Sequence, residues 1–305
     1  MAHDLTALLR RAGRLTHRGE PATRRRLAWT AFRRNHGAMA GLTILCLLVL
    51  LAVVGPTVTP YDPLEPDMNA LMTGPSKKHP MGTDQIGRDL LSRIVAGTPY
   101  TLRTAAIATG IAALIGVPFG LIGGYFGRRI GMAIDFLTDA MLAFPGIIFA
   151  LAMVTALGPG FTNAMIAIGI AFSPVYARVV RGQVLAVKQA PYVEAARAIG
   201  CKDHRIVLRH ILPGILAPVV VLSSMGVGGA ILAGAGLSYL GLGAQPPAPE
   251  WGALMNAGVW FYTTAPWITL FPGLAITVTV LAANLFGDGL RDALDPGLRA
   301  GPGVP

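Results

Sequence analysis

Residues 189–213 read QAPYVEAARAIGCKDHRIVLRHILP, a charged, Ala-containing segment with long apolar stretches on both sides. Pro191 suits the first turn of a helix. Gly200 can adopt the left-handed conformation that ends a helix, and Asp203 can cap a second short helix running to Arg209. The segment therefore predicts a polar hairpin of two short helices between apolar segments.

Long windows on either side of this hairpin contain no charged residue. The chain has 305 residues, of which 53% are hydrophobic and only 13% are charged, against about 25% charged in soluble domains. A helix needs about 20 apolar residues to cross a bilayer, so the windows predict an all-α membrane protein with six transmembrane helices. The uncharged windows are 35–61, 104–127, 140–177, 210–249 and 251–287, and the predicted spans are 37–58, 101–125, 134–156, 162–180, 212–236 and 267–287.

Lys and Arg residues gather on one side of these predicted spans. Nine Arg precede the first span, and seven Lys or Arg lie between the fourth and fifth spans. The opposite side has Lys77, Lys78, Arg88 and Arg93, with Arg103 at the boundary. Because basic residues accumulate in cytoplasmic loops, we expect both termini and the hairpin to face the cytosol. The net charge of +10 then reflects membrane topology and not a nucleic-acid-binding surface.

The same pattern divides the chain into five predicted segments. In the external segment, Thr83 or Asp84 can cap a short amphipathic helix before the second span. Part of the first tail has an apolar helical face, formed by Leu5, Leu8, Leu9 and Ala12, that suits the inner membrane surface. The segments are a cytosolic Arg-rich tail (1–36), a first transmembrane helix (37–58), an external segment (59–98), a transmembrane core (99–290, with the hairpin loop at 182–212) and a cytosolic tail (291–305).

Small residues recur at helical spacing in the second span. Gly116, Gly120 and Gly124 are four residues apart. Such residues let another helix approach closely in a membrane, so this face is expected to pack on a neighbour. Because Gly-rich spans also carry such patterns by chance, the pattern does not identify that neighbour.

The chain lacks the residues of a nucleotide-binding loop. A Walker A loop requires a Lys followed by Ser or Thr so that the Lys reaches the phosphates. None of the four lysines, at positions 77, 78, 188 and 202, is followed by Ser or Thr. We therefore expect a subunit that is not an enzyme and whose ATP, if it uses any, is bound by a partner.

The cysteines and histidines do not form a recognisable metal motif. Cys46 lies in the first predicted span and Cys201 in the hairpin, so a disulfide framework is not expected. Cys201, His204 and His210 match no standard zinc spacing. We therefore expect no metal site.

Asp135 and Asp139 lie four residues apart on one face of the third predicted span. Intramembrane acids can act as proton relays. Both residues are near the predicted cytosolic end, close to Arg128 and Arg129. Structural pairing is therefore the favoured interpretation.

The hairpin resembles the signature loop of type I ABC importer permeases. The resemblance is carried by Glu194-Ala195-Ala196, Gly200 and Leu212-Pro213. The family pattern has Ile three residues before the Pro, whereas this chain has His210 there and Ile211 next, a shift that resembles the peptide branch. Further segments resemble the C-type permease subunit of dipeptide and oligopeptide importers, a group that includes glutathione and nickel importers. They are Gly82-Thr83-Asp84 with Gly87-Arg88-Asp89, Leu240 to Pro247, Pro249 to Gly252 and Gly287 to Pro296.

The resemblance implies a type I ABC importer permease fold in a bacterial cytoplasmic (inner) membrane. It implies a heterodimer with a homologous permease, two cytosolic ATPases that bind the ATP, an external substrate-binding protein, and no cofactor in this chain. The residues implied to dock an ATPase and couple it to transport are Glu194, Ala195, Ala196, Gly200, Ile211, Leu212 and Pro213.

The cargo implied by the resemblance is a di- or oligopeptide, with glutathione or nickel as alternatives in the same class. Outside the class, a self-sufficient ion-coupled secondary transporter is the alternative, although the shortage of acids in the spans weighs against it. Polar residues in the spans can either line the path or bond neighbouring helices. They are Thr155, Asn163, Ser173, Ser223, Ser224 and Asn284.

Overall fold

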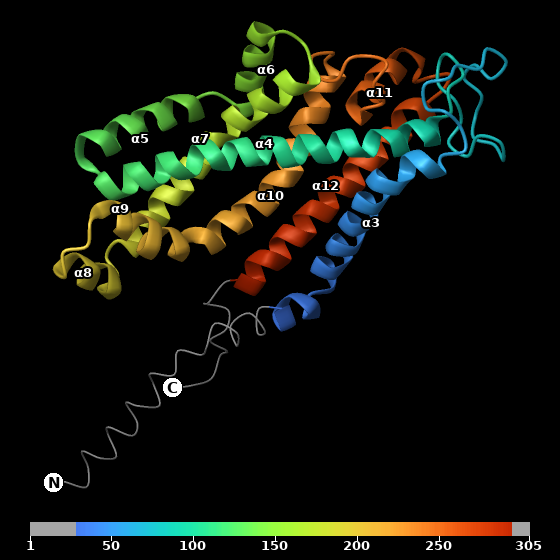
Figure 1. Ribbon diagram of the computed structural model, residues 1–305. Helices are drawn as coiled ribbons and strands as arrows, with labels where there is room; N and C mark the ends of the chain where they lie inside the picture. Colours follow the sequence, from blue (N-terminus) through green and yellow to red (C-terminus); the bar gives the residue numbers. More distant parts are fainter. Residues whose placement is uncertain (1–28, 295–305) are drawn as a thin grey trace.

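Long apolar helices make up most of residues 29–294, the part of the chain that the computed structural model describes (Figure 1). Within that range the one β-type pairing is an isolated bridge between Thr83 and Asp89, so the all-α prediction is confirmed. The elements in chain order are α3 (His36–Val58), α4 (Leu90–Phe126), α5 (Arg128–Leu142), α6 (Gly146–Leu157), α7 (Phe161–Val187), α8 (Pro191–Ala198), α9 (Asp203–Ile206), the π-helical turn η1 (Val207–Ile211), α10 (Leu212–Tyr239), α11 (Trp251–Gly258), the 3₁₀ turn η2 (Val259–Phe261) and α12 (Trp267–Leu294).

Five helical segments of the described chain are long and apolar enough to cross a membrane, and the pair α5–α6 makes a sixth if it counts as one broken span. The axes of α5 and α6 differ by 89°, so the unbroken third span predicted for residues 134–156 is wrong. Pro145 explains the break. It lacks the N–H that a continuous helix requires and forces the preceding residue out of helical geometry, and it occupies the N-cap position of α6.

Helices α4 and α7 pack along a stripe of glycines. A Cβ atom on Gly116 would lie 2.4 Å from the carbonyl oxygen of Ser173, and one on Gly120 would lie 2.6 Å from that of Ala177. Gly124 faces α7 in the same way. The prediction that these small residues admit a close neighbour is confirmed, and the neighbour is α7.

Helix α4 begins at Leu90 because Asp89 caps it. The carboxylate of Asp89 accepts a hydrogen bond from the backbone N–H of Ser92 at 2.8 Å, which satisfies a donor that the helix leaves free. The amphipathic helix expected to start at Thr83 or Asp84 is therefore wrong. The bridge between Thr83 and Asp89 holds that stretch as a loop, and α4 then runs unbroken into the second span.

Charged side chains of the 59–89 segment are buried in pairs beside the start of α4. Asp84 accepts from Arg88 at 2.7 Å and lies 3.6 Å from Arg93, while His79 Nδ1 lies 2.9 Å from Asp89 Oδ1. Buried charges are tolerated when they are paired. The pairs therefore fix the 59–89 segment onto α4.

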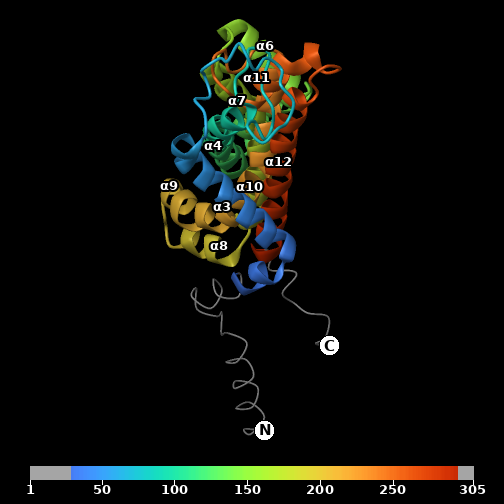
Figure 2. The ribbon, with the colours of Figure 1, turned by 90° about the vertical axis from the view of Figure 1, so that its right-hand side faces the viewer.

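Both ends of the described chain lie at the same end of the bundle as the hairpin (Figures 1 and 2). Phe32 packs with Ala293 in one cluster, and the Asn35 amide donates to Asp292 at 3.4 Å. The 59–89 segment and α11 lie at the opposite end (Figure 2). The hairpin and the two chain ends are therefore on one side of the bundle, as the predicted topology requires.

Parts of the predicted tails lie outside the described residues. These are residues 1–28, with the apolar face of Leu5, Leu8, Leu9 and Ala12, and residues 295–305. The predicted boundary of the first span, 37–58, coincides with α3 to within one residue.

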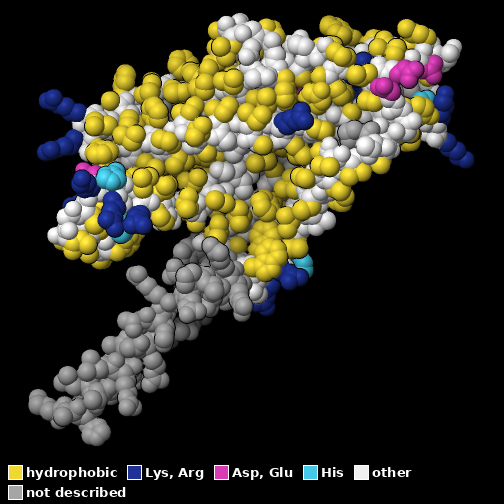
Figure 3. Space-filling view, in the orientation of Figure 1, with side chains coloured by type: hydrophobic (Ala, Val, Ile, Leu, Met, Phe, Trp, Pro, Cys, Tyr) yellow, Lys and Arg dark blue, Asp and Glu magenta, His cyan; other side chains and the backbone are white. Residues whose placement is uncertain are grey.

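Large apolar side chains cover the face of the bundle shown in Figure 3. Val53 on α3, Leu114 on α4, Phe136 on α5, Leu232 on α10 and Leu281 on α12 are all exposed. Apolar surfaces of this extent require lipid or another protein as their neighbour. The surface therefore agrees with the membrane prediction.

Candidate functional site

Helix α8 of the hairpin starts and ends as its sequence predicts. Pro191 occupies the first turn, and Gly200 has a φ of +78°. The N–H of Cys201 donates to the carbonyl of Ala196 at 3.1 Å, and that of Gly200 donates to Arg197 at 3.0 Å. This is a Schellman turn, which requires a left-handed residue after the helix. The predicted conformation of Gly200 is confirmed.

The inner side of the hairpin is an apolar base packed on the bundle. Its residues are fully or almost fully buried, and they meet side chains from α4 and α7. The hairpin is therefore packed against α4 and α7. The base consists of Val193, Ala196, Ile206, Ile211 and Ile215, packed on Leu121, Tyr125, Val180 and Val184.

Polar contacts tie this base to the last turn of α4. The hydroxyl of Tyr125 donates to Asp203 Oδ1 at 2.5 Å, and the ammonium of Lys188 donates to the Tyr125 carbonyl at 2.5 Å. Lys188 also lies over the Tyr125 ring, 5.4 Å from its centroid. Asp203 is the first residue of α9 and makes no side-chain cap, so its predicted capping role is wrong. Its carboxylate binds Tyr125 instead.

The second arm of the hairpin does not end at Arg209 as predicted. The α-helical hydrogen bonding of α9 ends at Ile206, and the helix continues through the π-helical turn η1 into α10 without a break. The N–H of Leu212 bonds to the carbonyl of Val207, five residues earlier, which is the π-helical pattern. Pro213, which lacks an N–H and so cannot donate to the preceding turn, follows directly in α10.

The structure separates the seven predicted docking residues into two groups. Glu194, Ala195, Gly200 and Pro213 are exposed, and Leu212 is half-buried. Ala196 and Ile211 are buried. Ala196 is buried because its position three residues after Val193 places it on the inner face of α8.

One exposed apolar residue of the hairpin was not predicted from the sequence. Ile199 has 80% of its surface exposed although its side chain is large and apolar. Its position as the C-cap of α8, immediately before Gly200, was the available signal. We call Glu194, Ala195, Ile199 and Gly200 the outer hairpin face. An apolar side chain exposed this far on a polar hairpin suits contact with another protein.

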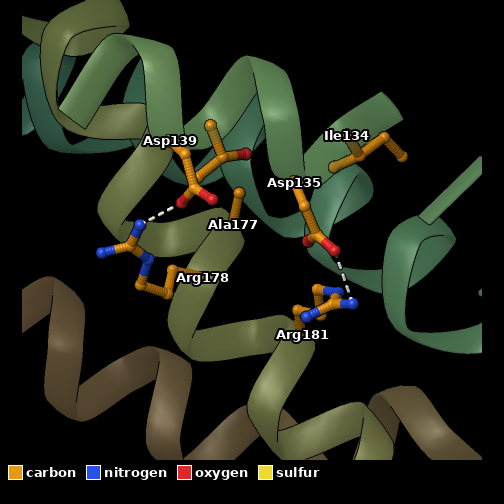
Figure 4. A pocket seen from close by; sticks show the side chains of 7 residues that line it. Ile134, Asp135, Asp139, Ala177, Arg178 and Arg181 are labelled. Atoms are coloured by element: carbon orange, nitrogen blue, oxygen red, sulfur yellow. Dashed lines mark hydrogen bonds and ion pairs between the residues drawn. The ribbon is translucent and has the colours of Figure 1, made fainter. Parts of the chain in front are cut away.

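Asp135 and Asp139 pair with arginines of α7 (Figure 4). Arg181 donates to Asp135 at 2.6 Å, and Arg178 donates to Asp139. The structural pairing predicted for these acids is confirmed. The arginines that pair with them come from α7 and not from the start of α5, because the middle of α5 packs along α7.

The polar residues considered for the path mostly bond within their own segments. The hydroxyls of Thr155, Ser173 and Ser224 donate to backbone carbonyls three or four residues earlier. The Asn163 amide donates to the carbonyls of Leu157 and Gly158. These bonds stabilise helices and turns. Across residues 29–294, no three His, Cys, Asp or Glu side chains gather closely enough to hold a metal ion.

Two family models match the chain. Residues 116–300 match the model described as the inner membrane component of binding-protein-dependent transport systems. Residues 23–75 match the model of the N-terminal transmembrane domain of oligopeptide transport permease C. The first match covers more than half of the chain and includes the hairpin.

Named relatives align over nearly the whole chain. A dipeptide transport system permease protein of Alkalihalophilus pseudofirmus is 43% identical over 275 residues, covering 90% of both chains. A glutathione transport system permease protein of Pectobacterium atrosepticum is 44% identical over 273 residues, covering 89% of this chain and 91% of the relative. The corresponding glutathione permease of Escherichia coli is 45% identical over 272 residues, covering 89% and 90%.

A solved structure shares the fold. An inward-facing structure of the MetNI methionine ABC transporter superposes with a TM-score of 0.55 at 19% identity, covering 68% of this chain and 98% of that chain. The predicted type I ABC importer permease fold is confirmed. Together with the family model and the relatives, it shows that this chain is a membrane permease subunit that belongs to the family of inner membrane components of binding-protein-dependent transport systems.

Proposed function

We propose that this chain forms half of the translocation path of an ATP-driven importer. The other half is a homologous permease, two cytosolic ATPases dock below, and an external binding protein delivers the cargo. The family description supports the need for a binding protein. The positive-inside pattern supports a bacterial cytoplasmic membrane with the hairpin and both termini in the cytosol.

The outer hairpin face carries this proposal. Glu194 on α8 and Ile199 at its C-cap are exposed, whereas Val193 and Ala196 on the inner side of α8 are buried against α4 and α7. A short helix with one face free and the other packed on the bundle fits a groove of a partner. When the two ATPases close on ATP, they move α8, and the buried base passes that movement to the long helices.

The remaining parts of the mechanism belong to the partners. No Lys of this chain is followed by Ser or Thr, so the ATP phosphates are held by the docked ATPases. The chain contributes coupling and a path, and it holds no cofactor.

The cargo proposed is a small peptide. Relatives of similar identity carry the names dipeptide permease and glutathione permease. Dipeptides and glutathione share a free ammonium group, at least one carboxylate and amide bonds. We assign di- or oligopeptides as the principal cargo and glutathione as the alternative. The names of these relatives do not support nickel, the other alternative.

Purification of the tagged chain from its own membrane in mild detergent tests the proposal. Mass spectrometry should find a second permease and one or two P-loop ATPases in the complex. Two substitutions, Glu194→Lys and Gly200→Pro, should abolish uptake while the chain remains in the membrane. Pro cannot adopt the positive φ of Gly200. Glu65→Lys reverses an exposed acid at the opposite end of the bundle and is the matched control. Full uptake by Glu194→Lys at normal expression, or uptake that survives ATP depletion without any ATPase in the complex, would overturn the proposal.

A further inference from the structure

Two ion pairs join α5 to α7 in a row along both helices (Figure 4). Asp135 pairs with Arg181, and Asp139 pairs with Arg178. The acids are four residues apart and the arginines three apart, so each helix presents its two charges on one face. The four side chains surround a cavity of about 180 Å³, to which Ala177 also contributes. We call these four side chains the charge ladder.

The charge ladder lies near the hairpin ends of α5 and α7. Helix α7 is one of the helices long and apolar enough to cross a membrane. Arg181 and Arg178 are six and nine residues before its end at Val187, which places them about 9 and 14 Å inside that end. Because α7 ends at the hairpin, the ladder lies in the half of the bundle nearest the hairpin.

The ladder is open on one side. The side chains of Asp139 and Arg178 are 64% and 58% exposed, and those of Asp135 and Arg181 are about a third exposed. A charged side chain in lipid costs about 3 kcal/mol even on the mildest scales, and such residues face protein or a water-filled cavity. The open side of the ladder therefore does not face lipid.

The inner pair also leaves one donor unused. Within residues 29–294, the Nε of Arg181 is buried and has no hydrogen-bond partner. A buried donor without an acceptor is costly. The exposed N–H groups of the Arg181 guanidinium, whose side chain is about a third exposed, can bind a further carboxylate, which their fork geometry suits.

We propose that the charge ladder lines the translocation path and binds the charged ends of a zwitterionic cargo during its passage. The proposal rests on the proposed function of this chain as a peptide permease. The carboxylate of a peptide bonds to Arg178 and Arg181, and its ammonium bonds to Asp135 and Asp139. Because the ladder has no net charge, a zwitterion exchanges ion pairs with it and leaves no charge unpaired in the membrane. Peptides of different side chains share these two ends, so the site is indifferent to sequence.

Cysteine accessibility tests whether the charge ladder lines the translocation path, independently of the cargo. In the complete complex with Cys46→Ser and Cys201→Ser, Asp139→Cys or Ile134→Cys is exposed to a charged methanethiosulfonate in inside-out vesicles. Ile134 lines the same cavity and is half-buried, and Ile134→Cys keeps both ion pairs and so protects the test against misfolding. Both should be modified rapidly, whereas Val53→Cys on the outer face of α3 should not. If Asp139→Cys and Ile134→Cys are as unreactive as Val53→Cys in both nucleotide states, the ladder does not line the path.

Variants with neutral side chains test whether the charge ladder binds the charged ends of the cargo. Asp139→Asn with Arg178→Gln removes the outer pair without leaving a buried charge, so a merely structural pair loses little when both residues change. The double variant should take up dialanine and glutathione about tenfold more slowly, since two charge-assisted bonds are lost. ATP hydrolysis stimulated by the loaded binding protein should stay at the wild-type level. Wild-type uptake by the double variant, or uptake and ATP hydrolysis that fall together, would overturn the role in cargo binding.

The two proposals fail in different ways. If the wild-type complex transports neither dialanine nor glutathione, the proposed cargo class is wrong, and the uptake arm for the ladder fails with it. Cysteine modification still reports whether the ladder faces water. If wild-type transport is normal and the double variant is unimpaired, only the ladder proposal is wrong.

Discussion

The hydroxyl of Tyr125, in the last turn of α4, donates a 2.5 Å hydrogen bond to the carboxylate of Asp203 in the hairpin. These residues are 78 positions apart in the sequence. The bond links the end of α4, a 37-residue helix, directly to the segment proposed to receive the ATPase. Lys188 holds the same turn of α4 from the other arm.

Tyr125→Phe removes this link and leaves the ring packing in place. A hydrogen bond of this kind contributes about 1 kcal/mol, so the complex should still assemble. Movement of the hairpin would reach α4 less efficiently, and uptake per ATP hydrolysed should fall severalfold. Uptake and ATP hydrolysis in reconstituted vesicles measure that ratio. Tyr262→Phe, at an exposed tyrosine on the opposite side of the bundle, is the control, and an unchanged ratio in Tyr125→Phe would contradict the link.

Ile199→Asp tests the apolar part of the outer hairpin face. The residue is exposed in the isolated chain, so folding should be unaffected. Burying a side chain of this size in an interface contributes about 1.5–3 kcal/mol, and a carboxylate there should reduce ATPase recovery at least tenfold. Quantitative mass spectrometry of the purified complex measures the recovery. Leu64→Asp, an exposed apolar residue of the 59–89 segment, should have no effect, and equal recovery in both variants would exclude Ile199 from the interface.

Gly120→Ala tests the close packing of α4 on α7. The added Cβ would lie 2.6 Å from the Ala177 carbonyl oxygen and 2.7 Å from Val180 Cβ. Backbone must shift to admit it, and overpacking of this kind costs about 1–3 kcal/mol. The unfolding temperature in detergent should fall. Gly110→Ala on the same helix is the control, because the added Cβ would meet no atom within 4 Å. Its unfolding temperature should equal or exceed that of the wild type. An equal change in unfolding temperature in the two variants would refute tight packing at Gly120.

Glu250 gives the fold a pH dependence. Its carboxylate caps α11 by accepting from the Ala253 N–H at 3.0 Å. Burial raises the pKa of Glu250 above its usual 4.5, and the hydrogen bond from Ala253 opposes this only in part. The folded state then keeps the proton to higher pH than the unfolded state, so stability falls as pH rises from about 4.5 through the raised pKa.

Glu250→Gln removes this titration and keeps an acceptor for the Ala253 N–H. Its unfolding temperature should change less with pH over that window than that of the wild type. Thermal unfolding at a series of pH values measures the two slopes. Glu65→Gln, at an exposed acid, should keep the wild-type slope, and identical slopes for Glu250→Gln and the wild type would contradict the assignment.

The features that depend on local sequence were predictable. Uncharged windows gave the spans, and Pro191 and Gly200 gave the bounds of α8, because caps and turns depend on a few adjacent residues. Residues 143–145 also carried a local signal, since Pro145 interrupts the third apolar window, but the length of that window favoured one continuous span.

Tertiary contacts were not predictable in the same way. The burial of Ala196 depends on which face of α8 meets α4 and α7, and the bond from Tyr125 to Asp203 joins distant segments. The partners of Asp135 and Asp139 had a usable signal. Arg178 and Arg181 are three residues apart on one helix, and Asp135 and Asp139 are four residues apart on another. This spacing favours ion pairs between the two helices over pairs within one helix.

Photo-crosslinking from Ala195 tests the central claim most directly. A photoreactive amino acid at this exposed position of α8 in the tagged chain is irradiated in intact membranes, and the adduct is identified by mass spectrometry. The same probe at Leu64, at the other end of the bundle, is the control. A P-loop ATPase bound to the probe at position 195 and not at position 64 is the predicted result. An assembled complex in which position 195 crosslinks to no ATPase would contradict the assignment of the hairpin as the coupling site.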